Sequence, residues 1–156
     1  MRQFLLITCI LCAFGVHAQD NRKVAVFNSV GNNVEAEFGD AVRDVLQEGF
    51  VKSGKFDVLE REQIEQVQKE IVFQANASDD QLVQMAAAVG ADYSCFASIT
   101  KIGINYQVAC KVVDAGNAYK VIFMDSRRTK QTDANAVLID LMDILDAIAN
   151  EIIKNI

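Results

Sequence analysis

Residues 93–125 read YSCFASITKIGINYQVACKVVDAGNAYKVIFMD and contain three strand-like runs separated by two turns. The runs Tyr93–Ile102, Tyr106–Asp114 and Tyr119–Asp125 are rich in β-branched, aromatic and other apolar residues, which favour strands. Gly103-Ile104-Asn105 and residues 114–117 (DAGN) have the composition of turns. Because connections this short join neighbouring antiparallel strands, the sequence predicts a three-stranded meander.

Helical spacing of apolar residues on both sides of this meander predicts helices that cover its sheet. Asn32 or Asn33 is expected to cap the first helix, Gly54 to end it, and Ser78 to cap a later one in a capping box with Gln81. The predicted elements are strand 23–28, a helix to residue 53, strand 56–59, helices 60–74 and 79–89, the meander, and helix 133–156. The order β-α-β-α-α-β-β-β-α predicts an α/β fold, a single-domain mixed sheet covered by helices.

The first eighteen residues have the pattern of a cleaved signal peptide. Arg2 supplies the positive charge, residues 4–16 form an uncharged and mainly apolar run, and Val16-His17-Ala18 fits a signal peptidase site. The apolar run is shorter than the roughly 20 residues that a membrane-spanning helix needs. We therefore expect residues 1–18 to be removed on export and residues 19–156 to form one domain in the periplasm, with a peripheral location at the outer membrane as a further expectation.

The composition of residues 19–156 excludes several classes of catalytic and binding site. The single histidine of the chain, His17, lies in the predicted signal, so the mature domain lacks a histidine base or histidine metal ligand. The full chain has a net charge of −6, and loss of Arg2 makes it −7. This acidity argues against nucleic acid or an anionic membrane surface as the target.

Two cysteines, Cys95 and Cys110, remain in the predicted mature domain, and export would place them in an oxidising compartment. They lie in the first two strands of the meander, where a short loop makes their positions diagonal rather than directly opposed. A diagonal pair has Cα atoms about 7–8 Å apart, at or beyond the usual limit for a disulfide. Buried thiols are therefore favoured over a disulfide between Cys95 and Cys110.

Other chemistry-bearing patterns are weak. Residues 29–32 (SVGN) follow a predicted strand but lack the further glycines and the lysine of a phosphate-binding loop, and we expect no cofactor. Asp140, Asp143 and Asp146 fall on one helix face, where solvent exposure is the simplest interpretation. The basic cluster at residues 127–130 is too small for a nucleic-acid footprint and indicates a turn or a docking edge.

Two motifs, taken together, resemble those of a known family. Residues 54–64 (GKFDVLEREQI), followed by Glu70, resemble its strand, Glu-Arg and helix signature, and Gly90-Ala91-Asp92-Tyr93 with residues 98–101 (SITK) resembles its second signature. The chain from about residue 22 to residue 155 is thus similar to the CsgG family of exported Gram-negative proteins. That family includes the curli secretion channel and is similar to the lipoprotein LpoB and the N-terminal domain of TolB.

The resemblance implies a domain that works through protein contacts and has no catalytic residues. It implies architectural roles for the motif residues, which are Glu60, Arg61, Glu70, Gly90, Asp92 and Thr100. One departure is Ala97, which stands where the family often has Gly. Two more limit the inference, and the first is that Cys9 and Cys12 lack the context of a lipid-accepting cysteine. Strand runs suited to a membrane barrel are not available beyond the core sheet.

The sequence leads to three functional hypotheses. The first is a non-enzymatic periplasmic interaction domain, an accessory or assembly factor of a cell-envelope complex with unidentified protein partners. The second is a ring-forming subunit of a curli-type secretion assembly at the outer membrane. The third is a hydrolase that uses only carboxylates, which would need a concave pocket lined by two acids.

Overall fold

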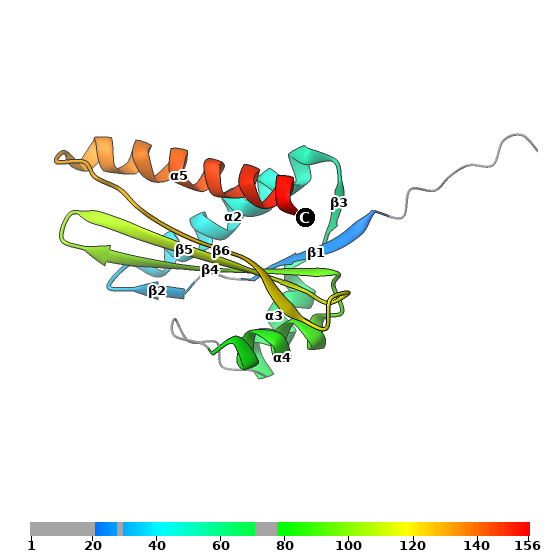
Figure 1. The fold of residues 1–156 in the computed structure, drawn as a ribbon. Coiled ribbons are helices and arrows are strands. Elements are labelled where there is room, and N and C mark those ends of the chain that lie inside the picture. The colour runs from blue at the N-terminus through cyan, green and yellow to red at the C-terminus, as the bar shows by residue number, and fades with distance from the viewer. Residues whose placement is uncertain (1–20, 28–29, 71–77) are drawn as a thin grey trace, which may run out of the picture.

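One mixed sheet of six strands organises the chain in the computed structural model, which describes residues 21–27, 30–70 and 78–156 (Figure 1). The predicted signal peptide therefore lies outside the described residues. The elements in chain order are β1 (Arg22–Val26), β2 (Val30–Asn32), α2 (Ala36–Ser53), β3 (Phe56–Val58), α3 (Arg61–Glu70), α4 (Asp79–Val89), β4 (Tyr93–Ile102), β5 (Asn105–Asp114), β6 (Lys120–Arg128) and α5 (Ala134–Asn155). The predicted α/β class with a mixed sheet is confirmed.

The strands lie in the order β3-β1-β4-β5-β6. β1 runs parallel to both β3 and β4, whereas β4, β5 and β6 form the antiparallel meander that the sequence predicts. The loop between β4 and β5 is Gly103-Ile104, one residue shorter than predicted, and Gly103 has a φ of 67° that a side chain would disfavour. The meander therefore provides half of the strands and one long free edge, at β6.

β2 is a strand whose residues have the composition of a turn and a helix cap. Val30–Asn32 pairs with Ser98–Thr100 of β4, on the same side on which β1 pairs with Tyr93–Cys95. The ten-residue β4 extends well beyond β1, so the chain can continue along the same edge. Asn33 then turns the chain with a φ of 56°, and Glu35 occupies the N-cap of α2 without a side-chain hydrogen bond, so the predicted Asn cap is wrong.

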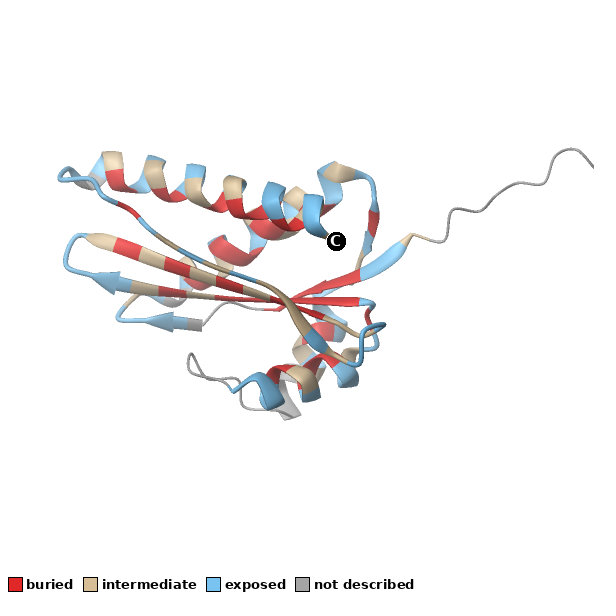
Figure 2. Ribbon diagram, viewed as in Figure 1, coloured by how far each residue is buried: buried red, intermediate tan, exposed pale blue. Residues whose placement is uncertain are grey.

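The two faces of the sheet carry different helices (Figure 2). Alternate residues along β1 and just after it separate the faces: Val24 and Val26 pack toward α2 and α5, whereas Ala25 and Phe27 pack toward α3 and α4. The face under α2 and α5 holds the larger core cluster, which includes Phe50, Leu145 and Ile148 among its fully buried side chains. Most of the buried apolar surface among the described residues therefore lies between these two helices and the sheet.

α2 and α5 lie close together because small residues, Gly49 and Ala149, face each other where the two helices meet. A Cβ built on Gly49 of α2 would lie 2.8 Å from the Cβ of Ala149 of α5, which is too close for a real side chain. Phe50, the next residue, packs edge-on against Phe56 of β3 with ring centroids 5.5 Å apart. The glycine is therefore explained by helix packing rather than by a turn.

Several helices begin or end at the capping residues that the sequence predicts. Ser78 and Gln81 form the capping box of α4, and Gly54 and Gly90 adopt the left-handed conformation at the C-caps of α2 and α4. Asp133 caps α5 by accepting hydrogen bonds from the main-chain N–H groups of Asn135 and Ala136. The described part of α3 ends at Glu70, and the predicted continuation to residue 74 lies outside the described residues.

The length and polarity of the helices show whether any of them could span a membrane. Among residues 21–27, 30–70 and 78–156, no helix combines the length and the apolar character that crossing a bilayer requires.

Candidate interaction surface

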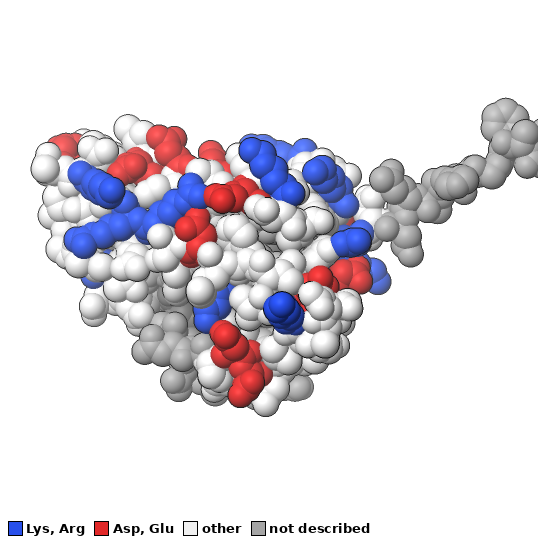
Figure 3. Space-filling view, viewed as in Figure 1, with Lys and Arg blue, Asp and Glu red and all other residues white. Residues whose placement is uncertain are grey.

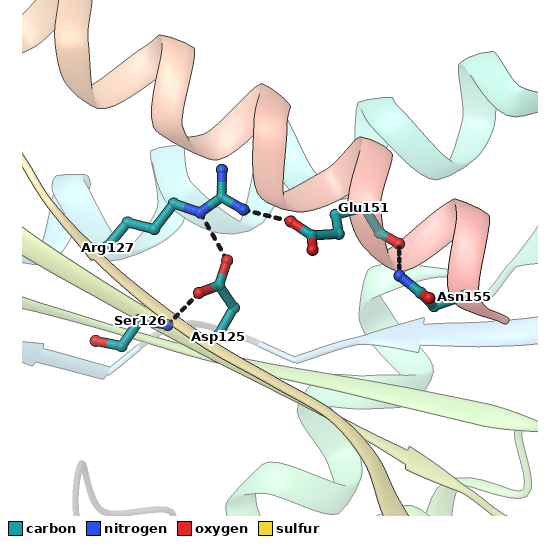
Figure 4. A network of polar contacts seen from close by, with 5 residues as sticks. All are labelled: Asp125, Ser126, Arg127, Glu151 and Asn155. Carbon is teal, nitrogen blue, oxygen red and sulfur yellow. Dashed lines mark hydrogen bonds and ion pairs between the residues drawn. The ribbon is translucent and has the colours of Figure 1, made fainter.

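The free edge of the sheet is joined to α5 by a network of charged side chains (Figure 4). The Arg127 Nε donates to Asp125 Oδ2 at 2.6 Å, and its guanidinium also forms an ion pair with Glu151 of α5. Asp125 accepts a second hydrogen bond from the main-chain N–H of Ser126, while the Asn155 side-chain amide donates to the carbonyl of Glu151. These contacts raise the pKa of Arg127, chiefly through the hydrogen bond to Asp125, and fix β6 relative to α5.

The basic cluster at residues 127–130 is thus divided among different roles. Thr129 is buried, and its hydroxyl accepts from the main-chain N–H of Tyr106 and donates to Asn105 Oδ1, which ties the end of β6 to the β4–β5 hairpin. Arg127 is held by the network above, so Arg128 and Lys130 are the cations that remain at the exposed surface of this cluster. The expectation of a turn or docking edge applies to these two residues alone.

The outer face of α5 exposes three large apolar side chains that we call the α5 patch: Leu138, Ile139 and Met142. Their exposed fractions are 46%, 66% and 47%. Residues 138 and 142 are one turn apart and residue 139 lies beside them, so the three form one contiguous surface. The exposed carboxylates of Asp143 and Asp146 follow along the same helix. An apolar surface beside charged residues on a rigid helix is typical of a protein contact site.

This surface could be predicted from the sequence only in part. The periodicity of residues 133–156 predicts an apolar arc that covers nearly half of the helix, with Met142, Ala149 and Ile153 at its margin as candidates for either contact or core packing. The structure exposes Met142, but Ala149 is buried against Gly49 and Ile153 is partly buried at the edge of the core. The same periodicity places Leu138 on the core face and leaves Ile139 outside the apolar set, whereas the structure exposes both. The apolar arc is wide, so the rotation of α5 about its axis against the sheet decides which apolar residues are exposed to solvent.

The Glu-Arg motif lies where the chain passes around the β3 edge of the sheet. Arg61 forms ion pairs with Glu65 of its own helix at 2.5 Å and with Asp40 of α2 at 3.1 Å. The hydrogen bond to Glu65 is the main reason that the pKa of Arg61 is raised, and the charge of Asp40 raises it further. Since α2 and α3 cover opposite faces, the pair with Asp40 links the two helix layers. Glu60, immediately before α3, is exposed.

A buried arginine accompanies this link. The side chain of Arg43 on α2 is almost fully buried, and its guanidinium donates to Gln47 Oε1 at 2.8 Å. Burial lowers the pKa of Arg43, and the nearby positive charge of Arg61 lowers it further. Sequence patterns gave no signal for this arginine, because it occupies a polar position in an amphipathic helix.

The remaining motif residues are dispersed rather than gathered into one site. Gly90 ends α4, and Asp92 Oδ2 accepts a hydrogen bond from the main-chain N–H of Lys23 at 2.7 Å. Thr100 lies half-buried in β4 between Asn32 and Gln107 of the neighbouring strands. Glu70 is the last described residue of α3, and its side chain lies outside the described residues. These positions agree with architectural roles, which remain a proposal.

Cys95 and Cys110 occupy the diagonal positions that the sequence predicts. Cys95 lies opposite Val112 and Cys110 lies opposite Ala97, and both side chains are fully buried as free thiols. Their Sγ atoms are 3.3 Å apart, and the hydrogen bond between the two thiols, together with burial, raises the pKa of Cys110. Their redox state remains a prediction, which alkylation of unreduced, denatured protein can decide.

One concave site brings two carboxylates together, as the hydrolase hypothesis requires. A pocket of about 420 Å³ is lined by Asp92 and Asp114 together with Arg22, Tyr93, Gly116 and Asn117. Each acid already accepts a main-chain hydrogen bond, Asp92 from Lys23 and Asp114 from Gly116. Both carboxylates therefore have a role in shaping the loops around the pocket. In the described part of the chain, no three Cys, Asp or Glu side chains are placed to hold a metal ion.

Solved structures share this fold at low sequence identity. The LpoB C-terminal domain from Salmonella enterica matches with a TM-score of 0.53 and 16% identity over 81% of this chain and 94% of that one. The lipoprotein GNA1162 from Neisseria meningitidis matches with a TM-score of 0.55 and 15% identity over 84% and 96%. The hypothetical protein CT253 from Chlamydia trachomatis gives a TM-score of 0.50 and 13% identity over 86% and 94%.

Sequence comparison gives the family. No curated protein gives a significant match to the chain. The family model described as "Curli production assembly/transport component CsgG" matches residues 14–148, which include every described strand and most of α5. The chain therefore belongs to the CsgG family.

Proposed function

We propose that this chain is an exported, non-enzymatic interaction domain that serves as an accessory or assembly factor of a cell-envelope complex. Membership of a family described by assembly and transport supports this role. The predicted signal peptide supports a periplasmic location, with peripheral association at the outer membrane. The observation that carries the proposal is the α5 patch, which supplies a rigid surface for a protein partner.

The α5 patch is suited to a protein contact because its residues belong to a helix that is anchored in the core. Val137, Leu141 and Leu145 bury the adjoining side of α5 in the larger core, so binding would order little of the helix backbone. Burying the exposed part of each apolar side chain contributes on the order of 1 kcal/mol. Three neighbouring side chains of this kind can therefore form the centre of a small interface.

Site-specific photo-crosslinking in the native envelope tests the proposal. A photoreactive residue at position 139 should give one discrete adduct, identified by mass spectrometry. The matched control is position 124 on β6, because Met124 is also apolar and is 72% exposed. Absence of an adduct from position 139, or the same adducts from both positions, would contradict a partner site at the α5 patch.

The ring-forming alternative rests on the outer edge of β6. This strand pairs only with β5 among the described strands, so its other edge can accept a strand from another chain. Light scattering of the purified domain, with and without detergent and lipid, separates the two proposals. A defined oligomer favours the ring, and a strict monomer in every condition contradicts it.

The hydrolase alternative is tested at the pocket that contains Asp92 and Asp114. Asp92→Asn and Asp114→Asn keep the size of each side chain while removing its charge. A turnover by the purified domain that either substitution abolishes, with folding unchanged by circular dichroism, would overturn the non-enzymatic proposal.

A further inference from the structure

A second pocket lies at the end of the molecule where α5 and α2 both finish. It has a volume of about 450 Å³ and is lined by residues from the start of β1, the α2–β3 turn and the last turn of α5. We call it the basic-end pocket, and its lining is Asn21, Arg22, Gly54, Lys55, Phe56, Ile153, Lys154 and Ile156. In Figure 3, Lys and Arg atoms gather over this end of the molecule.

Three cations from separate elements converge on this pocket, and no Asp or Glu belongs to its lining. Arg22 donates a hydrogen bond to the Tyr93 hydroxyl and lies 5.5 Å from the centre of that ring. The ammonium groups of Lys55 and Lys154 form no hydrogen bond or ion pair with the residues that the structure describes. The pocket therefore has two cations available for an anion and a third held at its edge.

Helix dipoles account for part of this charge. Lys154 lies in the last turn of α5, where a cation stabilises the negative end of the helix. Arg22 and Lys55 belong to β1 and to a turn, so this effect does not explain them.

Besides the cations, the lining consists of Asn21, Gly54 and three apolar side chains. Phe56 is buried, and Ile153 and Ile156 are partly buried at the edge of the core. Such a lining accepts a hydrocarbon or glycerol portion beside a charged group. The combination indicates a ligand with an anionic group attached to an apolar body.

We propose that the basic-end pocket binds the phosphate headgroup of an anionic phospholipid at a membrane surface. The apolar run at residues 4–16 precedes Asn21 of the pocket by only four residues. The four residues between them can span at most roughly 14 Å, so we expect this pocket to lie beside the bilayer while the leader is attached. Lys55 and Lys154 then bind the phosphate, and Phe56 and Ile153 contact the apolar portion of the lipid.

This assignment revises the conclusion drawn from net charge. The chain total of −6 argued against an anionic membrane, but surface charges act mainly within a Debye length of about 8 Å. Within the pocket lining the balance is positive, so local charge rather than total charge governs contact with lipid. The proposal is independent of the protein partner of the α5 patch, and either can fail alone.

Co-sedimentation with phosphatidylcholine vesicles, with and without phosphatidylglycerol, tests the proposal on the chain from Gln19, which holds every described element. Lys55→Gln/Lys154→Gln should weaken binding to phosphatidylglycerol vesicles about 25-fold, because each lysine near an anionic leaflet contributes about fivefold. The matched control, Arg128→Gln/Lys130→Gln, removes the same charge from exposed residues outside the pocket and should change binding less than threefold.

The remaining outcomes also decide the question. Binding that does not depend on phosphatidylglycerol, or equal losses in both double variants, would overturn the proposal. A parallel titration with inorganic phosphate is monitored by NMR, through the amide chemical shifts of Gly54 and Lys55. Shifts with phosphate but no binding to vesicles would identify a free-phosphate site and would also overturn the membrane assignment.

Discussion

The two faces of the sheet differ in what holds them together. Under α2 and α5, long apolar side chains from two packed helices meet alternate residues of β1, β4 and β5 in the larger core cluster. Under α3 and α4, a smaller cluster that includes Phe27, Met85 and Phe96 packs against the other side of the same strands. We infer that the face under α2 and α5 contributes most of the free energy of folding, while α3 and α4 cover only part of the other face.

The largest expected effect comes from a matched pair of phenylalanines, one on each face. Phe50→Ala should lower the free energy of unfolding by about 4 kcal/mol, because a fully buried ring leaves a cavity between α2, α5 and β3. Phe27→Ala should lower the free energy of unfolding by about 3 kcal/mol, because the smaller α3–α4 layer can relax further to fill the cavity. Urea unfolding measures both, and a larger loss from Phe27→Ala would reverse the ranking of the two faces.

The next effect tests the close approach of α2 and α5. Gly49→Ala should destabilise the protein by about 2 kcal/mol, since the new Cβ would lie 2.8 Å from the Cβ of Ala149. Gly49→Ala combined with Ala149→Gly should be more stable than the two single effects predict when added. Strict additivity in this double-mutant cycle would show that the two helices move apart without loss.

A smaller effect is expected at the start of α4, on the other face. Ser78→Ala should cost about 1 kcal/mol, because the main-chain N–H of Gln81 loses its side-chain acceptor. Ser78→Asp keeps an acceptor and serves as the control. Hydrogen exchange should show faster opening of α4 in the alanine variant, and equal exchange in both variants would contradict the role of the cap.

The smallest effect concerns the link between the faces. Arg61→Gln removes the ion pair with Asp40, but the Arg61 side chain is 46% exposed, so the loss should be only about 0.2–0.5 kcal/mol and should shrink further at high salt. Asp40→Asn and the double variant complete the cycle. A coupling energy above about 1 kcal/mol would show that the motif arginine holds the two layers together more strongly than its exposure indicates.

Sequence reasoning succeeded where local chemistry is decisive. Ser78, Gly54 and Gly90 act at helix ends as predicted, because capping depends on a few neighbouring residues. The register of the β4–β5 hairpin follows from its short loop, and the diagonal placement of Cys95 and Cys110 follows from that register. These features require no knowledge of distant parts of the chain.

The candidate surfaces were harder to predict, because they depend on which residues remain uncovered. Ile139 is exposed and Ala149 is buried only because α5 lies in one rotation against α2 and the sheet. β2 forms because β4 extends beyond β1, which no pattern within residues 30–32 reveals. The cations Arg22, Lys55 and Lys154 are far apart in sequence and meet only at the basic-end pocket.

The sequence by itself determined the α/β class, the antiparallel meander, the capping box of α4, the glycine C-caps of α2 and α4, and the resemblance to the CsgG family. Periodicity, turn chemistry and motifs act over a few residues, so they can be read without coordinates. Only the tertiary structure decided which apolar residues of α5 face outward, how Arg61 links the two faces, and where positive charge gathers in an acidic chain. Exposure and local charge depend on the packing of distant segments, which is the physical reason that the sequence alone could not supply them.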